Sequence, residues 1–144
     1  FYNVDFSTEE KRLLDRILSE RIFPENIRPY LKKASPDLMN KFDGDHCKKG
    51  ITVTSSGFYG PQGRNLRLKS RIIDLNKRLS SFSYNGNSIL NFEMETSALY
   101  ALSKLLGHKS CTICAVIANR FSKTYSKNYK IPIENLIKIV LERI

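Results

Sequence analysis

The apolar residues near the beginning of the chain recur at three- and four-residue intervals, which is the spacing of an amphipathic helix. Just before them, Ser7 and Glu10 have the spacing of a capping box, an arrangement typical of a helix start. We therefore predict a helix that opens at Ser7. Its apolar positions are Leu13, Leu14, Ile17 and Leu18.

The pattern changes after this helix. Three prolines interrupt the chain between residues 24 and 36. The last of them, Pro36, is well placed in the first turn of a short helix that Ser35 caps. The β-branched run Ile51 to Thr54 then predicts a strand that enters a loop at residues 58–64. This loop reads Phe-Tyr-Gly-Pro-Gln-Gly-Arg, and its glycines and proline predict an irregular backbone.

The second half of the chain alternates strand and helix signals. Asn85-Gly86 is a hairpin-turn dipeptide, so Ser88 to Phe92 is predicted to be a strand. A helix follows and ends at Gly107, and the apolar run Cys111 to Ala118 predicts a buried strand. Strand, helix and strand in succession predict a right-handed βαβ unit with a parallel sheet. An amphipathic helix that starts near Pro132 completes a single α/β domain, with a mixed, partly parallel sheet flanked by helices.

The size of the chain fits one compact domain. It has 144 residues, of which 41% are hydrophobic, and the eight Phe and seven Tyr can supply a core. It begins with Phe1 rather than Met, so we expect a piece of a longer gene product. Its apolar runs are much shorter than the roughly 20 residues of a membrane-spanning helix, and no signal peptide is visible. We expect no membrane partner.

The three cysteines include a Cys-x-x-Cys pair, Cys111 and Cys114, which on a loop could bind a metal or act in redox chemistry. In a buried strand, cysteine behaves as a small hydrophobic residue, and the second ligand pair typical of a zinc site is absent. We therefore expect no metal site. Reduced thiols favour a cytoplasmic location.

The net charge of +10 raises the alternative of a nucleic-acid-binding protein. The positive residues are scattered over predicted helix faces and loops. A local basic run, formed by Lys123, Lys127 and Lys130, is interleaved with two tyrosines. This patterning favours a solvated loop beside an anionic ligand over a platform for nucleic acid, so we expect no nucleic-acid partner.

Three polar clusters follow predicted strands. They are the loop at 58–64, the segment Glu93-Met94-Glu95, and Asn119-Arg120. In open α/β sheets, ligands bind outside the carboxyl ends of the strands, where loops and helix starts converge. Each cluster taken alone could also have a purely structural role. Glu93 or Glu95 could cap a helix, Arg64 and Arg120 could be surface groups, and Phe58 could be a core residue.

The same clusters resemble those of a known family. The loop at 58–64 resembles the uracil-recognition loop of uridine phosphorylases, with Phe58, Gln62 and Arg64 at the family's spacing. Asn91 to Glu95 resembles the family's ribose-binding segment, and Val116 to Arg120 resembles its later pocket strand. The chain is thus similar to the C-terminal half of a nucleoside phosphorylase, most like a uridine phosphorylase.

The resemblance implies a role for each matching residue. Phe58 stacks on the base, while Gln62 and Arg64 hydrogen-bond its polar edge. Glu95 accepts hydrogen bonds from the ribose hydroxyls, and Met94 packs against the sugar. The remaining members are Ile117 and Ala118, which line the base pocket, Phe92 and Glu93, which belong to the ribose wall, and Asn119 and Arg120, which brace the loop.

The implied reaction is phosphorolysis of uridine to uracil and ribose 1-phosphate, with phosphate as co-substrate and without a cofactor. Purine-specific relatives and the related nucleosidases place an Asp where this chain has Asn119, which favours a pyrimidine base. Three alternatives remain: a purine nucleoside phosphorylase, a nucleosidase, and a non-catalytic nucleoside-binding remnant. A homo-oligomer, a dimer or a hexamer built of dimers, is also implied.

The chain departs from the family in two respects. The family's phosphate ligands lie in an N-terminal half that this sequence does not contain, so we expect no phosphate-binding residues here and no phosphorolysis by these residues alone. Gly60-Pro61 also stands where uridine phosphorylases usually read Pro-Gly, which could shift the recognition loop.

Overall fold

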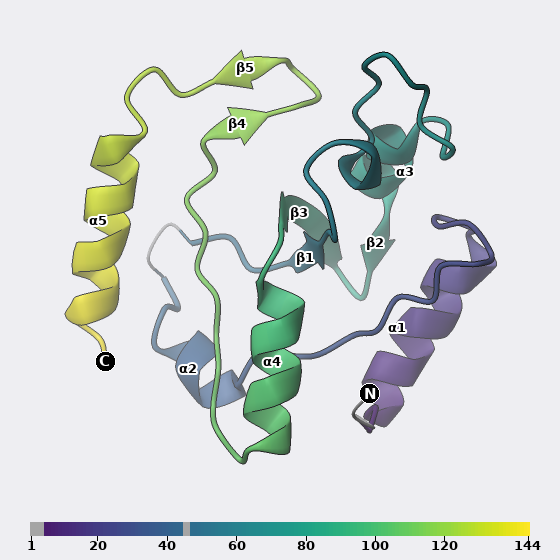
Figure 1. Cartoon of the computed structure of the whole chain (residues 1–144). Coiled ribbons are helices and arrows are strands. Elements are labelled where there is room, and N and C mark those ends of the chain that lie inside the picture. The colour runs from purple at the N-terminus through teal and green to yellow at the C-terminus, as the bar shows by residue number, and fades with distance from the viewer. Residues whose placement is uncertain (1–4, 45–46) are drawn as a thin grey trace.

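The computed structural model describes residues 5–44 and 47–144, and it shows a small mixed sheet with helices around it (Figure 1). The helices are α1 (Thr8–Ser19), α2 (Pro36–Asn40), the 3-10 helix η1 (Gly60–Gln62), α3 (Leu75–Ser81), α4 (Thr96–Leu105) and α5 (Lys130–Leu141). The strands are β1 (Ile51–Thr54), β2 (Ser83–Tyr84), β3 (Asn87–Glu93), β4 (Ala118–Asn119) and β5 (Thr124–Tyr125).

The central sheet has the strand order β1-β3-β2. β1 pairs with β3 in parallel, with Thr54 opposite Glu93 at the carboxyl ends of the two strands, and β2 pairs with β3 in antiparallel fashion. The connection from β1 to β3 runs through α3, so a helix joins the two parallel strands, as parallel pairing requires. This arrangement confirms the predicted mixed, partly parallel sheet flanked by helices.

The turn between β2 and β3 follows the sequence signal. Asn85 and Gly86 have φ of 49° and 77°, which places both residues in the left-handed region that a two-residue hairpin turn needs. Gly107, with φ of 74°, likewise lies just beyond the end of α4, where a left-handed residue commonly terminates a helix. Both local predictions are confirmed.

The predicted capping box at the start of α1 is present. The Ser7 side chain accepts from the Glu10 N–H at 3.2 Å, and the Ser7 N–H donates to the Glu10 carboxylate at 2.8 Å. The same carboxylate forms an ion pair with the buried Lys32 at 3.1 Å and accepts from the Lys33 N–H at 2.9 Å. Glu10 therefore ties α1 to the extended segment before α2.

This network predicts an acid-sensitive contribution to stability. Partial burial acts to raise the pKa of Glu10, but the hydrogen bonds from Ser7, Lys32 and Lys33 outweigh it and hold the pKa below its ordinary value. The stabilisation is therefore present above the unfolded-state pKa and is lost as pH falls through the lower, folded-state pKa.

We expect Glu10→Gln to lower the free energy of unfolding near pH 7 by about 1–2 kcal/mol and to have little effect at pH 3. Urea unfolding of both proteins across this pH range measures the difference. The exposed neighbour Glu9 serves as the control position. A Glu10→Gln penalty that is independent of pH would contradict this account of the carboxylate.

The buried core lies between α1, α3 and one face of the sheet. It contains Ile17, Ile22, Leu75, Leu79 and Phe82, with Val53 and Phe92 of the sheet packed against it. The accessible surface of the chain is 11119 Å², whereas a compact monomer of 16.6 kDa has about 7,600 Å². Apolar burial is thus concentrated on one side of the sheet, and α4 and α5 keep large apolar side chains exposed.

The predicted buried strand from Cys111 to Ala118 is wrong. Residues 111–117 have no regular secondary structure, Val116 is 65% exposed, and only the last residue of the run enters the two-residue strand β4. β4 pairs with β5 and not with the central sheet, so the predicted βαβ unit is not closed. An apolar, β-branched run forms a strand only where a neighbouring strand satisfies its backbone, and the described residues provide none for this one.

The final helix begins at Lys130, two residues before the predicted start at Pro132, so the proline occupies its first turn, where a missing N–H costs nothing. None of the helices in residues 5–44 and 47–144 has both the length and the apolar character needed to cross a membrane.

Candidate functional site

The loop that leaves β1 is held in a tight bend by its own backbone. Within residues 59–64, the N–H groups of Gln62 and Arg64 both donate to the Tyr59 carbonyl, at 3.1 and 3.0 Å, and the Gly63 N–H donates to the Gly60 carbonyl at 2.9 Å. Gly63 has φ of 71°, a conformation that residues with a Cβ rarely adopt. The bend therefore presents Phe58, Gln62 and Arg64 from one short, ordered stretch.

An aromatic ring and a guanidinium group meet in this loop. The Arg64 guanidinium carbon lies 3.9 Å from the centroid of the Phe58 ring, and Tyr59 packs edge-on against Phe58 with a centroid distance of 5.3 Å. Phe58 is 47% exposed, so its ring is accessible at the surface. At 3.9 Å the guanidinium covers the ring face at a distance where a planar base would otherwise stack. A base that uses this face must displace Arg64.

Arg120 connects the loop to two other strand ends. It follows β4, and its guanidinium donates to the Gln62 carbonyl at 3.3 Å. The same group lies 5.4 Å from the Phe58 ring and 5.7 Å from the ring of Phe92, near the end of β3. Partial burial, together with the charge of Arg64, lowers the pKa of Arg120. One side chain thus joins the predicted clusters after β1 and β4 and also reaches Phe92 of β3, but among the described residues it makes no hydrogen bond, ion pair or cation–π contact with the cluster at 93–95.

Gln62 is the buried polar member of the loop. It is only 2% exposed, and its Oε1 has no hydrogen-bond partner within the described part of the chain. A buried acceptor without a donor costs about 1–3 kcal/mol, so such atoms usually mark a place where a ligand or water supplies the donor. The Gln62 carboxamide oxygen is therefore a buried acceptor that still lacks a donor among the residues that the structure describes.

Glu93 has the capping role that its position in the sequence also allowed. Its carboxylate accepts from the N–H groups of Glu95 and Thr96, at 2.7 and 2.6 Å, at the start of α4, and it also pairs with the Thr54 hydroxyl. Partial burial acts to raise the pKa of Glu93, but these hydrogen bonds outweigh it and lower the pKa. Both carboxylate oxygens are occupied by the protein itself.

Glu95 is arranged differently from Glu93. It is exposed, and its carboxylate accepts a 3.3 Å hydrogen bond from the adjacent Met94 N–H. Met94 is 40% exposed. Of the two acidic residues at this junction, Glu95 is thus the one whose carboxylate remains accessible to a ligand. Within residues 5–44 and 47–144, no hydrogen bond, ion pair or cation–π contact joins Glu95 directly to the loop at 58–64.

The remaining predicted residues lie along the segment before Arg120. Ile117 is 45% exposed and Ala118 is half-buried, and neither has a polar or ring contact with the loop among the described residues. The Asn119 side chain accepts from the N–H groups of Phe121 and Ser122, at 3.0 and 3.1 Å. Asn119 therefore shapes the turn between β4 and β5, while Arg120 makes the contact to the loop.

Sequence reasoning missed Thr54 and Asn76. Thr54 holds Glu93 and accepts from the Ser97 N–H at 3.0 Å, which follows from its position opposite Glu93 in the parallel pair. A correct β1–β3 register would have identified it. Asn76 lies against Gly63, and its side-chain oxygen is buried without a described partner. No sequence signal distinguishes Asn76 from an ordinary residue in the first turn of a helix.

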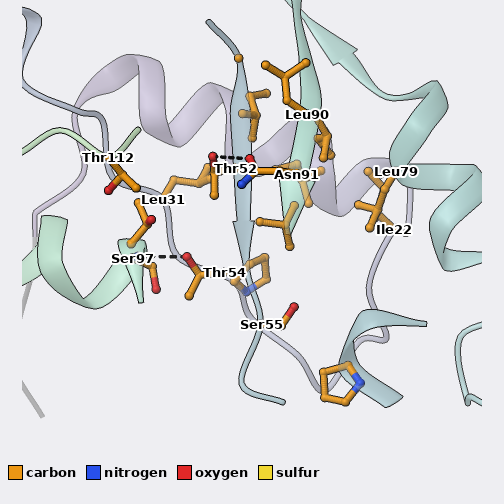
Figure 2. A pocket seen from close by; sticks show the side chains of 18 of the residues that line it. Ile22, Leu31, Thr52, Thr54, Ser55, Leu79, Leu90, Asn91, Ser97 and Thr112 are labelled. Atoms are coloured by element: carbon orange, nitrogen blue, oxygen red, sulfur yellow. Dashed lines mark hydrogen bonds between the residues drawn. The ribbon is translucent and has the colours of Figure 1, made fainter. Parts of the chain in front are cut away.

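A wide groove runs along β1, and its lining includes residues of the buried core as well as residues near α4 (Figure 2). Some of its polar groups are paired with each other: Thr52 donates to Asn91 at 2.8 Å, and the Ser97 N–H donates to Thr54. Its volume of about 2190 Å³ exceeds the roughly 300–1,000 Å³ of a small-molecule site. Of the predicted site residues, Arg64 alone lines this groove, and its loop neighbours at 59–61 line it as well, so the groove reaches one side of the loop at 58–64.

The residues that the structure describes include no group of three or more His, Cys, Asp or Glu side chains placed to hold a metal ion. Partial desolvation raises the pKa of both Cys111 and Cys114, which disfavours the thiolate form that binds metals.

Comparisons with known proteins relate the chain to one family. Residues 8–144 match the family model described as Phosphorylase superfamily. A uridine phosphorylase of Thermococcus kodakarensis (strain ATCC BAA-918 / JCM 12380 / KOD1) is 33% identical over 103 residues, which cover 65% of this chain and 34% of that protein. The aligned region thus spans about a third of the length of that relative. No solved structure gives a significant match.

Proposed function

Because the chain belongs to the Phosphorylase superfamily, we propose that the intact protein cleaves uridine with phosphate, giving uracil and ribose 1-phosphate. The observation that carries the proposal is the contact of Arg120, at the end of β4, with the loop that follows β1. An aromatic ring, a buried carboxamide with a free oxygen and two guanidinium groups come together there. These groups suit a flat, polar base. The similarity to a uridine phosphorylase supports the choice of uracil.

The arrangement suits a reaction in which the base departs with negative charge. Cleavage of the glycosidic bond leaves positive charge on the sugar ring, and the electron pair of the bond moves to the base. Donors from Gln62 and Arg64 strengthen their interaction as that charge builds, which lowers the barrier more than it tightens substrate binding. Arg120, 5.4 Å from the centroid of the Phe58 ring, adds positive potential to the base site.

The ribose is proposed to lie beside Glu95 and Met94. Glu95 has an exposed carboxylate that can accept hydrogen bonds from the ribose hydroxyls, and Met94 offers an apolar contact to the sugar. Negative charge near the ring also favours the positive charge that develops there. Glu93 contributes by holding the start of α4, and thereby Glu95, in place.

Phosphate is proposed as the attacking co-substrate, without a metal or cofactor. We assign no phosphate ligand to residues 1–144, and we propose that other parts of the intact protein supply the phosphate ligands. The same family resemblance supports a homo-oligomer and a role in pyrimidine nucleoside salvage.

Uracil release by the intact protein, measured with and without phosphate, tests the proposal. We expect release from uridine that depends on phosphate and produces ribose 1-phosphate in equal amount. Inosine is the matched control substrate, and it should react much more slowly. Release that does not require phosphate would indicate a nucleosidase, and faster cleavage of inosine would indicate a purine enzyme. No release from either nucleoside would overturn the enzymatic proposal.

A further inference from the structure

Asn76, in the first turn of α3, stands against the bend that joins Gln62 to Arg64. Gly63 makes this bend, and a Cβ built on Gly63 would lie 3.2 Å from both Oδ1 and Nδ2 of Asn76. That spacing is shorter than ordinary van der Waals contact, so the carboxamide of Asn76 packs directly on the Gly63 backbone. The two loop residues assigned to the base are therefore separated by a glycine whose position Asn76 limits.

Asn76 lies between two of the most deeply buried residues of the core. Leu75 precedes it and Leu79 lies one turn later, and each is only 2% exposed within the core cluster. α3 cannot shift without disturbing that core. A side chain on a well-packed helix can hold a neighbouring loop in a fixed place more precisely than the loop's own irregular backbone can.

Two buried oxygen atoms beside this bend lack a donor. Oδ1 of Asn76 and Oε1 of Gln62 are both buried, and neither has a hydrogen-bond partner in residues 5–44 and 47–144. Each such acceptor costs about 1–3 kcal/mol while it stays unpaired. One of them belongs to the residue before Gly63 and the other to the residue that packs on Gly63, so a ligand at this bend could complete the pairing of both.

We propose that Asn76 is a positioning residue that orients the Gln62 carboxamide toward the base. The Gln62 side chain carries two N–H donors and one acceptor oxygen. In the occupied site, one N–H of Gln62 donates to Oδ1 of Asn76, and the other donates to a carbonyl of the base. The Gln62 oxygen then accepts an N–H from the base. This arrangement satisfies both unpaired oxygens.

The proposal specifies which base edge the site selects. A carboxamide held in this orientation needs a ring N–H next to a carbonyl oxygen, as in uracil, and it disfavours a base whose ring nitrogen carries a methyl group. The inference rests on the proposed function and deepens it, because it assigns the selection of this edge to a pair of residues rather than to Gln62 alone.

The test compares uridine with N3-methyluridine as substrates of the intact protein. We expect Asn76→Ala to reduce the preference for uridine about 10-fold, mainly by raising KM for uridine, with a small change in Tm. Asn76→Asp keeps an acceptor at the same place and should restore most of the preference. Lys77→Ala, on the exposed side of α3, is the matched control and should leave the preference unchanged.

An unchanged preference in Asn76→Ala overturns the inference while leaving the proposed function intact, and a lower Tm alone indicates a purely structural role. Asn76→Ser replaces the alanine variant if that variant does not fold. If the wild-type protein cleaves no nucleoside, calorimetry with uracil still tests the role of Asn76. Roughly 10-fold weaker uracil binding by Asn76→Ala supports the inference, and an affinity equal to that of the wild type overturns it. Absence of uracil binding by the wild type overturns both.

Discussion

Replacing Arg64 with alanine is expected to lower kcat/KM for uridine at least 100-fold in the intact protein. Arg64 is the guanidinium closest to Phe58, at 3.9 Å, and it is proposed to donate to the base as negative charge develops there. Loss of one donor aimed at developing charge costs roughly 3 kcal/mol of transition-state stabilisation. Steady-state kinetics measures the effect, which should fall mainly on kcat.

Lys127→Ala is the control for this prediction, because Lys127 is an exposed basic residue outside the cluster around Phe58. It removes the same unit of charge and should change kcat/KM less than twofold. If the two variants lose activity equally, the loop at 58–64 does not form the base site, and the contribution of positive charge is general rather than local.

Glu95→Ala and Glu93→Ala are expected to have opposite consequences. Glu95 is exposed and proposed to accept hydrogen bonds from the ribose, so Glu95→Ala should lower kcat/KM for uridine about 100-fold. Each hydrogen bond to a charged group is worth about 1.5–3 kcal/mol. The protein itself makes little use of this carboxylate, so Tm should change little.

Glu93→Ala removes the acceptor for two N–H groups at the start of α4 and the partner of the Thr54 hydroxyl. Loss of a helix cap alone costs about 1–2 kcal/mol, so this variant should unfold at a clearly lower temperature. Thermal unfolding and kinetics, measured on both variants, separate the two roles. A Glu95→Ala protein that keeps full activity, or a Glu93→Ala protein that keeps full stability, would contradict the division.

Elements whose signals are local could be predicted from the sequence. The capping box of Ser7 and Glu10 and the turn at Asn85-Gly86 depend on residues a few positions apart, and both form as expected. The grouping of Phe58, Gln62 and Arg64 is similarly local, because one tight bend holds all three. Their contact with Arg120 was expected from the convergence of strand ends and from the family resemblance.

Features that depend on a distant partner could not be predicted in the same way. The run from Cys111 to Ala118 has the composition of a strand, but the described residues offer no neighbour to pair with residues 111–117. The contact of Glu93 with Thr54 depends on the pairing of β1 with β3, which no local signal in the sequence reveals. The contact of Asn76 with Gly63 depends on how α3 packs, which no short motif reveals.

A crystal structure of the intact protein with uridine tests the central claim most directly. We predict that the base stacks on Phe58 with the Arg64 guanidinium moved from the ring face to the base edge, and that the ribose hydroxyls contact Glu95. A nucleoside bound away from Phe58, or a ribose that does not reach Glu95, would contradict the account.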